Sequence, residues 1–586
     1  MTNPEFFEEK SFEGIAVAPG IAHGPIYIHH TDNEAPPCFG ITQEEIPREI
    51  QRFEAALIAT RAEIIEMQQK IAEAIGAKDA SIFDAHLLVV EDRTLIDEVL
   101  RTLDAKKQNV EHIFQSVANR YSDTLSKIDD PYLRERAYDI HDVTRRVIRN
   151  LLGKSGRPLS SVDYPHIVAA QNLTPSDTAL LNRDFALGFA TEGGSKTSHT
   201  AIMARSLGIP AIAGLEDFMG QVREGQTILI DGYKGCVILN PTPATLERYG
   251  QIEDQKEAVE ERLSQLRETL STTQDGRKIV LSANMEMIDD LPSVKECGAE
   301  GIGLYRTEFL YLNRTDYPTE EEQYEVYSKV AQATAPHGVI IRTMDIGGDK
   351  FIGDERKEAN PFLGCRAIRL CLENVDVFKT QLRAILRAGA LGNVRIMYPM
   401  ISSLEELREA TAILEECKNA LRGEGQPFAE NIEVGIMIEV PSAALCADLL
   451  AREVRFFSIG TNDLIQYTIA ADRLNEHIAH LYQPTHPAVL RLIKMVVQAA
   501  HSAGIWVGVC GEMAGDVIMT PLLLGLGIDE LSASAPAVPR IKRAVQSLNQ
   551  IECEQLVEHV MTYDTAEAIL RDIEAHARAN YEELVG

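Results

Sequence analysis

Cysteine pairs, long apolar runs and positive charge are all scarce in this chain of 586 residues. The nine cysteines include no pair with C-x-x-C spacing and their number is odd, which argues against both a disulfide framework and a zinc site. No apolar run reaches the roughly 18 residues that a membrane-spanning helix needs. The polar, acidic start MTNPEFFEEKSFEG is not that of a signal peptide. We therefore expect a cytoplasmic protein without membrane insertion.

Acidic residues outnumber basic residues by 88 to 57, which gives a formal net charge of −31. Proteins that bind nucleic acids generally need a basic surface, so this balance argues against that class. The excess of acid fits either a basic partner or simple solubility. Any anionic substrate would have to be held by a local group of arginines or lysines.

The chain changes character twice in its first half. Short strand-like runs with glycine and proline occupy residues 1–40 and return over 155–240. Between them, over 41–154, glycine is scarce and apolar residues recur at helical spacing, with helical stretches predicted near 81–103, 110–128 and 132–152. We predict a multidomain α/β protein in which one α/β domain is interrupted by an inserted helical domain. A charged helical linker follows over 241–274.

After residue 275 eight short apolar runs alternate with helical segments. Over about 300 residues this rhythm is typical of a (β/α)₈ barrel, or TIM barrel, and we predict one over 275–586. The eight runs are KIVLSANM, GIGLYR, GVIIRTMDIGG, NVRIMYPM, EVGIMIEVP, VRFFSIGTND, GIWVGVCGEM and ELSASAP.

Polar side chains follow five of these runs, at the strand ends where such barrels place their chemistry. Arginine binds phosphate and carboxylate with two parallel hydrogen bonds, and carboxylates suit Mg²⁺ that shares its shell with substrate oxygens. The pattern therefore indicates a small anion that carries phosphate. Taken singly, each arginine could be a surface ion-pair partner, and the cysteine could be a small buried residue or a proton donor or acceptor. The side chains are Arg306, Arg342, Glu439, Asn462, Asp463, Arg473, Cys510 and Glu512.

A lone histidine, His199, lies in the segment TEGGSKTSHTAIMARSLGIPAIAGL. Thr197 and Ser198 can cap a helix expected over 200–207, and the positive end of that helix favours an anion. An imidazole placed there could carry a phosphoryl group covalently. A hydrogen-bonded histidine in a strand-to-helix turn would fit the same residues.

The segment GGSKTSHTAIMARSLGIPAIAG resembles the phosphohistidine segment of the enzyme I family, the phosphoenolpyruvate–protein phosphotransferases of the sugar phosphotransferase system. The stretches GLYRTEFLY, RTMDIGGDK, VGIMIEVPSAA, FFSIGTNDLIQYTIAADR and GVCGEMAGD resemble that family's barrel motifs, in its order. SIFDAHLLVVED in the insert resembles it as well, so the likeness covers nearly the whole chain. One departure is Lys196, which stands where the family usually has arginine and lacks the forked guanidinium.

The resemblance implies a phosphotransferase that moves the phosphoryl group of phosphoenolpyruvate to its own histidine and then to the phosphocarrier protein HPr. Pyruvate is released in this first step of sugar uptake. His199 would take the phosphoryl group on Nε2, and Cys510 would protonate the enolate carbon. Glu439 and Asp463 would ligate Mg²⁺, the insert would dock HPr, and the barrel would form a homodimer. The substrate would be held by Arg306, Arg342, Asn462, Asp463 and Arg473.

Two alternatives stay open. A regulatory phosphorelay enzyme would use the same chemistry with a different phosphocarrier. A pyruvate phosphate dikinase or phosphoenolpyruvate synthase would share the histidine and the barrel motifs, but these enzymes carry an ATP-binding module, and no glycine-rich loop of the P-loop type precedes His199. In all three interpretations His199 and the barrel site lie in different predicted domains. We therefore expect the domain that carries His199 to move about the linker, so that the histidine can reach the barrel site and leave it.

Overall fold

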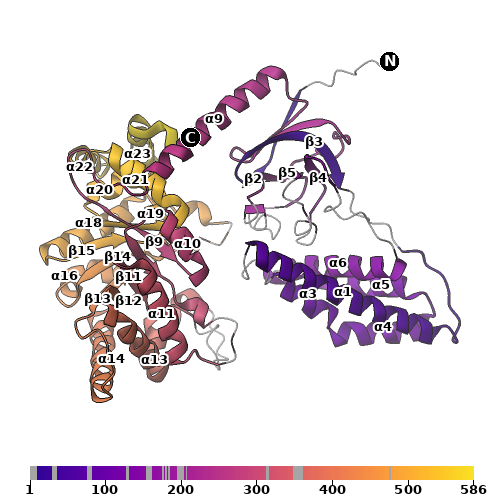
Figure 1. Cartoon of the computed structure of the whole chain (residues 1–586), viewed down its shortest axis with the longest axis horizontal. Coiled ribbons are helices and arrows are strands. Elements are labelled where there is room, and N and C mark those ends of the chain that lie inside the picture. The colour runs from indigo at the N-terminus through magenta and orange to yellow at the C-terminus, as the bar shows by residue number, and fades with distance from the viewer. Residues whose placement is uncertain are drawn as a thin grey trace. The chain divides into compact units, whose positions relative to one another are not determined.

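The computed structural model divides the chain into two compact units, Met1–Gln255 and Lys256–Gly586, which Figure 1 colours from indigo to yellow along the chain. No helix in the described part of the chain is long and apolar enough to cross a membrane. His199 and most of the helix expected over 200–207 lie outside the described residues. The structure describes residues 9–29, 36–75, 82–126, 131–153, 162–173, 177, 181, 185–194, 204–205, 208–311, 314, 316–347, 360–473, 475 and 477–585.

The first unit is built on an eight-stranded sheet. Its strands are β1 (Lys10–Glu13), β2 (Ile15–Ala18), β3 (Ile21–His29), β4 (His166–Ala170), β5 (Ala186–Thr191), β6 (Ala211–Ala213), β7 (Thr227–Asp231) and β8 (Cys236–Leu239). They lie in the order β1-β8-β7-β3-β4-β5-β6-β2. The middle strands β3 to β6 pair in parallel, and the outer strands pair antiparallel. The central strands β4 and β5 are buried, as their continuous apolar sequences indicate. The predicted α/β domain is thereby confirmed.

The described residues between β3 and β4 are mainly helical, as predicted. The helices are α1 (Ile46–Ile75), α3 (Ile82–Val90), α4 (Arg93–Lys106), α5 (Val110–Ser126) and α6 (Pro131–Leu152). They enclose a core of their own around the buried rings of Phe53, Phe83 and Phe114. The stretch expected near 81–103 is two helices, because Asp92 interrupts it. The Asp92 carboxylate accepts from the main-chain N–H of Thr94 at 2.8 Å, which starts a new helix.

One long helix, α9 (Pro243–Gln265), occupies most of the predicted linker. Near its start, Leu246 and Ile252 pack beside the sheet of the first unit. Near its end, Val259 and Leu263 belong to the core of the second unit. The two ends of one helix are therefore fixed in different units.

The second unit is a closed barrel of eight parallel strands, ordered β9 to β16, which confirms the predicted TIM barrel (Figure 1). Each predicted apolar run contains one strand. The strands are β9 (Val280–Met285), β10 (Gly301–Tyr305), β11 (Gly338–Arg342), β12 (Val394–Tyr398), β13 (Glu433–Ile438), β14 (Phe456–Ile459), β15 (Trp506–Val509) and β16 (Glu530–Ser534). Because the strands are parallel, all their carboxyl ends meet at one rim.

Helices connect and surround these strands. Two of the longest begin with capping boxes, Thr319 with Glu322 before α11 and Ser403 with Glu406 before α14. The helices are α10 (Leu291–Glu296), α11 (Glu320–Thr334), α12 (Ile368–Glu373), α13 (Val375–Ala388), α14 (Leu404–Gly423), α15 (Pro441–Leu445), α16 (Ala447–Leu450), α17 (Thr461–Ile469), α18 (Pro487–Ser502), α19 (Glu512–Gly515), α20 (Thr520–Leu526), α21 (Val538–Ser547), α22 (Gln550–Val560) and α23 (Ala566–Tyr581).

Candidate active site at the barrel rim

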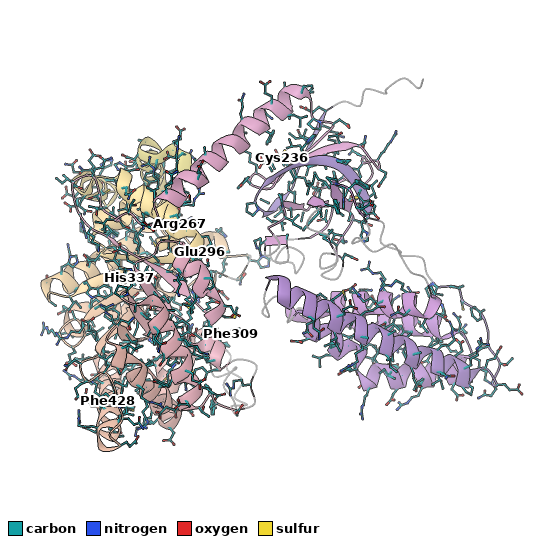
Figure 2. All side chains as sticks on the ribbon, in the orientation of Figure 1. Cys236, Arg267, Glu296, Phe309, His337 and Phe428 are labelled. Carbon is teal, nitrogen blue, oxygen red and sulfur yellow. The ribbon has the colours of Figure 1, made fainter. Side chains whose placement is uncertain are left out.

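The site residues predicted in the second unit lie at or just beyond the carboxyl ends of barrel strands, except Arg473, which follows helix α17. Arg342 ends β11, Glu439 follows β13 and Cys510 follows β15. In Figure 2, Phe309, which follows β10, marks this rim, and His337, which precedes β11, marks the opposite end of the barrel. Parallel strands thus bring to one rim side chains that are far apart in the sequence.

Arg342 is the most enclosed arginine of the predicted set. Its Nη2 donates to Glu308 Oε1 at 2.9 Å, and its Nη1 lies 2.9 Å from Asp345 Oδ2. Burial tends to raise the pKa of Asp345, but Arg342 and Arg366 outweigh burial and lower it. Burial dominates at Glu308 and raises its pKa despite Arg342. The Nε of Arg342 is buried and has no hydrogen-bond partner among the described residues, and the same is true of the Nε of Arg306. Two guanidinium groups at this rim therefore keep a donor for a ligand.

Arg366 belongs to the same network, although the sequence did not point to it. Its Nη2 donates to Asp345 Oδ1 at 2.8 Å and lies 3.6 Å from Asp463 Oδ2. Its Nη1 also donates to the Tyr467 hydroxyl at 3.4 Å. Arg366 comes from an irregular segment before α12, so the signal of a polar residue after an apolar run does not find it.

Glu439 and Asp463 form a carboxylate pair that is under electrostatic strain. Glu439 is buried, and burial together with Asp463 and Asp345 raises its pKa to about 8. Its Oε1 accepts from the main-chain N–H of Met400 at 2.6 Å. A divalent cation would relieve this repulsion, so the donor chemistry fits Mg²⁺. The described residues contain no group of three or more His, Cys, Asp or Glu side chains that could hold a metal ion by themselves.

Cys510 lies inside the barrel at this rim. It belongs to the interior cluster that includes Leu304, Met437 and Phe456. Its Sγ donates to the Ile459 carbonyl at 3.8 Å. Burial raises the pKa of the thiol to about 11. The thiol is therefore protonated at neutral pH and can give up a proton.

Two further predicted residues, Arg473 and Asn462, both donate hydrogen bonds to Glu512. Arg473 Nη1 donates to Glu512 Oε1 at 2.8 Å, and Asn462 Nδ2 donates to the same oxygen at 3.1 Å. Arg306 likewise donates through Nη1 to the carboxylate of Glu286. The rim thus gathers every predicted site residue of the second unit, while the predicted nucleophile is outside the described residues.

Three family profiles match this chain in succession. The profile "PEP-utilising enzyme, N-terminal" matches residues 13–136. The profile "PEP-utilising enzyme, mobile domain" matches residues 162–235, and "PEP-utilising enzyme, PEP-binding domain" matches residues 260–550. The last of these contains the rim just described.

Relatives that match this chain over nearly their whole length indicate the same family of enzymes that use phosphoenolpyruvate. A phosphoenolpyruvate-protein phosphotransferase of Staphylococcus carnosus (strain TM300) is 44% identical over 97% of this chain and 99% of its own length. Its counterpart from Bacillus sp. (strain S) is 46% identical over 96% of this chain and 97% of its own length. An NMR structure of an Enzyme I (nEIt) protein is 37% identical, with 42% of this chain and 99% of that chain covered and a TM-score of 0.37. The chain belongs to the phosphoenolpyruvate-protein phosphotransferases, the enzyme I family of the phosphotransferase system.

Proposed function

We propose that this protein transfers the phosphoryl group of phosphoenolpyruvate to His199 and from there to the phosphocarrier protein HPr, and releases pyruvate. One observation carries the barrel half of the proposal. The Nε groups of Arg306 and Arg342 are buried at the same rim, and no residue that the structure describes accepts a hydrogen bond from them. A buried donor that lacks a partner costs free energy, and a bound anion with several oxygens removes that cost. Phosphoenolpyruvate is such an anion.

The protein promotes phosphoryl transfer by positioning the reacting groups and by offsetting the negative charge of the substrate. His199 Nε2 attacks phosphorus, the P–O bond breaks, and its electron pair leaves on the enol oxygen as an enolate. Arg306, Arg342 and Arg473 offset the charge of the phosphoryl and carboxylate groups, and Asn462 donates to the substrate. Glu439 and Asp463 would hold Mg²⁺, which supplies further positive charge to substrate oxygens when bound.

Cys510 completes the reaction by protonating the enolate at carbon. The electron pair of the enolate takes the thiol proton, which gives pyruvate and leaves a thiolate. A pKa near 11 keeps the proton on sulfur until the enolate forms. The positive charges of Arg342 and Arg306 act on this sulfur and favour the thiolate once it forms.

The helical insert offers a surface for HPr. Ile58 on α1 and Leu88 on α3 are large apolar side chains that are 70% and 66% exposed. Between them, Arg61 of α1 donates to Glu91 of α3 at 2.6 Å. Exposed apolar side chains on neighbouring helices are typical of docking surfaces. The strong negative charge of the chain suits a basic partner.

The barrel also has an apolar face that supports the proposed homodimer. Helices α15 and α16 both pack against α18. Each of these helices exposes a large apolar side chain, namely Leu445, Leu449 and Met495. A second copy of the chain would cover these side chains in a two-fold arrangement.

We further propose that the domains are 1–40 with 155–240, 41–154, 241–274 and 275–586, and that α9 is the hinge between the histidine and the barrel. Its start packs in the first unit and its end in the second. Beyond its end, Lys542 Nζ donates to the Arg267 carbonyl at 2.9 Å and the Thr269 carbonyl at 3.1 Å. These bonds tie the chain after α9 to the barrel, so the hinge is best placed within the helix, between Ile252 and Val259.

The test is incubation with phosphate-labelled phosphoenolpyruvate and Mg²⁺. We expect acid-labile phosphate on the protein, and none on the His199→Ala variant. His337→Ala, at the opposite end of the barrel, serves as the matched control and should label normally. Label that persists on the His199 variant would contradict the proposal. Labelling by ATP in place of phosphoenolpyruvate would favour a dikinase or synthase.

A further inference from the structure

Two groups that the proposed function assigns to the substrate already share an acceptor in the free protein. Arg473 Nη1 and Asn462 Nδ2 lie 2.8 Å and 3.1 Å from one oxygen, Oε1 of Glu512. Two converging donors of this kind are what an oxygen of a carboxylate or phosphate group requires. Glu512 Oε1 therefore offers these two donors the kind of acceptor that a substrate oxygen would offer.

The Glu512 side chain is free to leave this position. It is 75% exposed, at the start of the short helix α19. Exposed ion pairs of this kind are worth little, because water and salt screen them. The carboxylates that hold Arg342 differ, since Glu308 and Asp345 are largely enclosed and belong to the framework of the site. Exposure thus separates a removable carboxylate from the fixed ones.

We infer that Glu512 is a built-in competitor of phosphoenolpyruvate: its carboxylate occupies Arg473 and Asn462 in the free enzyme and moves aside when the substrate binds. This inference rests on the proposed function, because it needs Arg473 and Asn462 to bind substrate. Glu512 lowers the affinity for phosphoenolpyruvate, since each substrate molecule must first displace it. Neutralising or removing the carboxylate therefore tightens substrate binding.

The main chain at the same residue allows this role to be separated from a positioning role. The N–H of Glu512 donates to Asn462 Oδ1 at 2.9 Å. Substitution of the side chain leaves that bond in place, so the amide of Asn462 keeps its orientation in every variant at this position. A side chain that positioned Arg473 for the substrate would weaken binding when removed, and a competitor does the opposite.

The experiment is titration calorimetry of phosphoenolpyruvate with Mg²⁺ on the full chain in a His199→Ala background, which prevents turnover. We expect Glu512→Gln to lower Kd and Glu512→Ala to lower it further, by about two- to fivefold in all, the range of an exposed ion pair. The affinity for phosphoenolpyruvate rises less in the glutamine variant, because its amide oxygen can still accept hydrogen bonds from Arg473 and Asn462. The decrease in Kd should become smaller as the salt concentration is raised, because salt screens the ion pair between Glu512 and Arg473. KM for phosphoenolpyruvate in enzyme with His199 intact should fall in parallel.

Glu433→Gln is the matched control, because Glu433 is an exposed glutamate paired with Arg395 at the opposite end of the barrel. It should leave Kd unchanged. A raised or unchanged Kd in both Glu512 variants overturns the competitor role. Arg473→Ala separates this failure from a failure of the proposed function. If Arg473→Ala binds phosphoenolpyruvate normally, the substrate site is wrongly assigned. If it loses affinity while the Glu512 variants gain none, only the competitor role is wrong.

Discussion

Cys510 is the residue whose environment most directly fits its proposed step. Burial holds its pKa at about 11, so the sulfur keeps a proton at neutral pH. We predict that Cys510→Ala binds phosphoenolpyruvate nearly as well as the native protein but forms pyruvate about 10² to 10⁴ times more slowly, the usual contribution of a positioned proton donor. Calorimetry measures the first effect and a coupled assay for pyruvate measures the second.

A second buried cysteine provides the control for that prediction. Cys417 on α14 is buried, and burial raises its pKa to about 11 as well, but it contacts the Lys379 carbonyl on the outer helical layer. Cys417→Ala removes the same atoms without touching the rim, so pyruvate formation should continue at the native rate. Unchanged pyruvate formation in Cys510→Ala would remove Cys510 from the mechanism.

At the residue scale, the sequence predicts site residues that directly follow an apolar strand. Arg342 and Glu439 are of this kind, because a parallel strand aims the next side chain at the rim. Arg366 was missed because an irregular segment, which has no periodicity, brings it to Asp345. The role of His199 stays a prediction, since that residue lies outside the described part of the chain. No pattern in the sequence shows that two arginine Nε groups find no acceptor within the described part of the chain, because this depends on packing.

At the element scale, the barrel strands were predictable because strands buried on both faces read as continuous apolar runs. All eight runs hold a strand. The boundary between α3 and α4 was missed because it depends on the hydrogen bonds of one side chain. The Asp92 carboxylate captures the N–H groups of Thr94 and Leu95 and so starts a helix within an apolar stretch.

The surface of α1 and α3 supports a prediction about the phosphocarrier. Leu88→Asp places a charge in the proposed docking surface, where burial against HPr would leave it unpaired. We expect transfer from phosphorylated protein to HPr to weaken at least tenfold in kcat/KM, which is about 1.4 kcal/mol or more. Labelling of His199 by phosphoenolpyruvate should stay normal. Glu98→Gln on α4 changes charge on another helix of the insert and should affect neither step. Normal transfer by Leu88→Asp would place the docking surface elsewhere.

At the scale of the whole molecule, the face formed by α15, α16 and α18 supports a prediction about assembly. Leu445→Asp puts a charge at the most exposed of its apolar side chains. We expect the native protein to sediment as a dimer and the variant to sediment as a monomer at the same concentration, because the interface would bury an unpaired carboxylate. Ile551, which is also exposed but lies on α22, offers the control Ile551→Asp. A dimeric Leu445→Asp would contradict the assignment of this face.

The proposed function sets conflicting demands on His199. In that proposal the histidine reaches the barrel rim to take the phosphoryl group and leaves the rim to meet a protein as large as HPr. The middle of α9 reads IEDQKEA, a stretch with four charged residues in seven. Both ends of the helix are packed, as Leu246 and Leu263 show. Movement of the histidine therefore requires bending or rotation within α9.

This requirement predicts the effect of a crosslink between the units. Cysteines replace Tyr164 of the first unit and Phe309 of the second, both exposed, in a background where Cys38 and Cys446 are serine, and bis-maleimides of several lengths are then applied. We expect each crosslinked species to keep at most one half-reaction, either labelling by phosphoenolpyruvate or transfer to HPr. A bis-maleimide crosslink within the second unit, between cysteines at positions 270 and 546, is the control. Gln546 already donates to the Leu270 carbonyl at 3.0 Å, so this crosslink restrains nothing that must move, and both half-reactions should continue. A crosslink between the units that leaves both half-reactions at full rate would rule out the swing about α9.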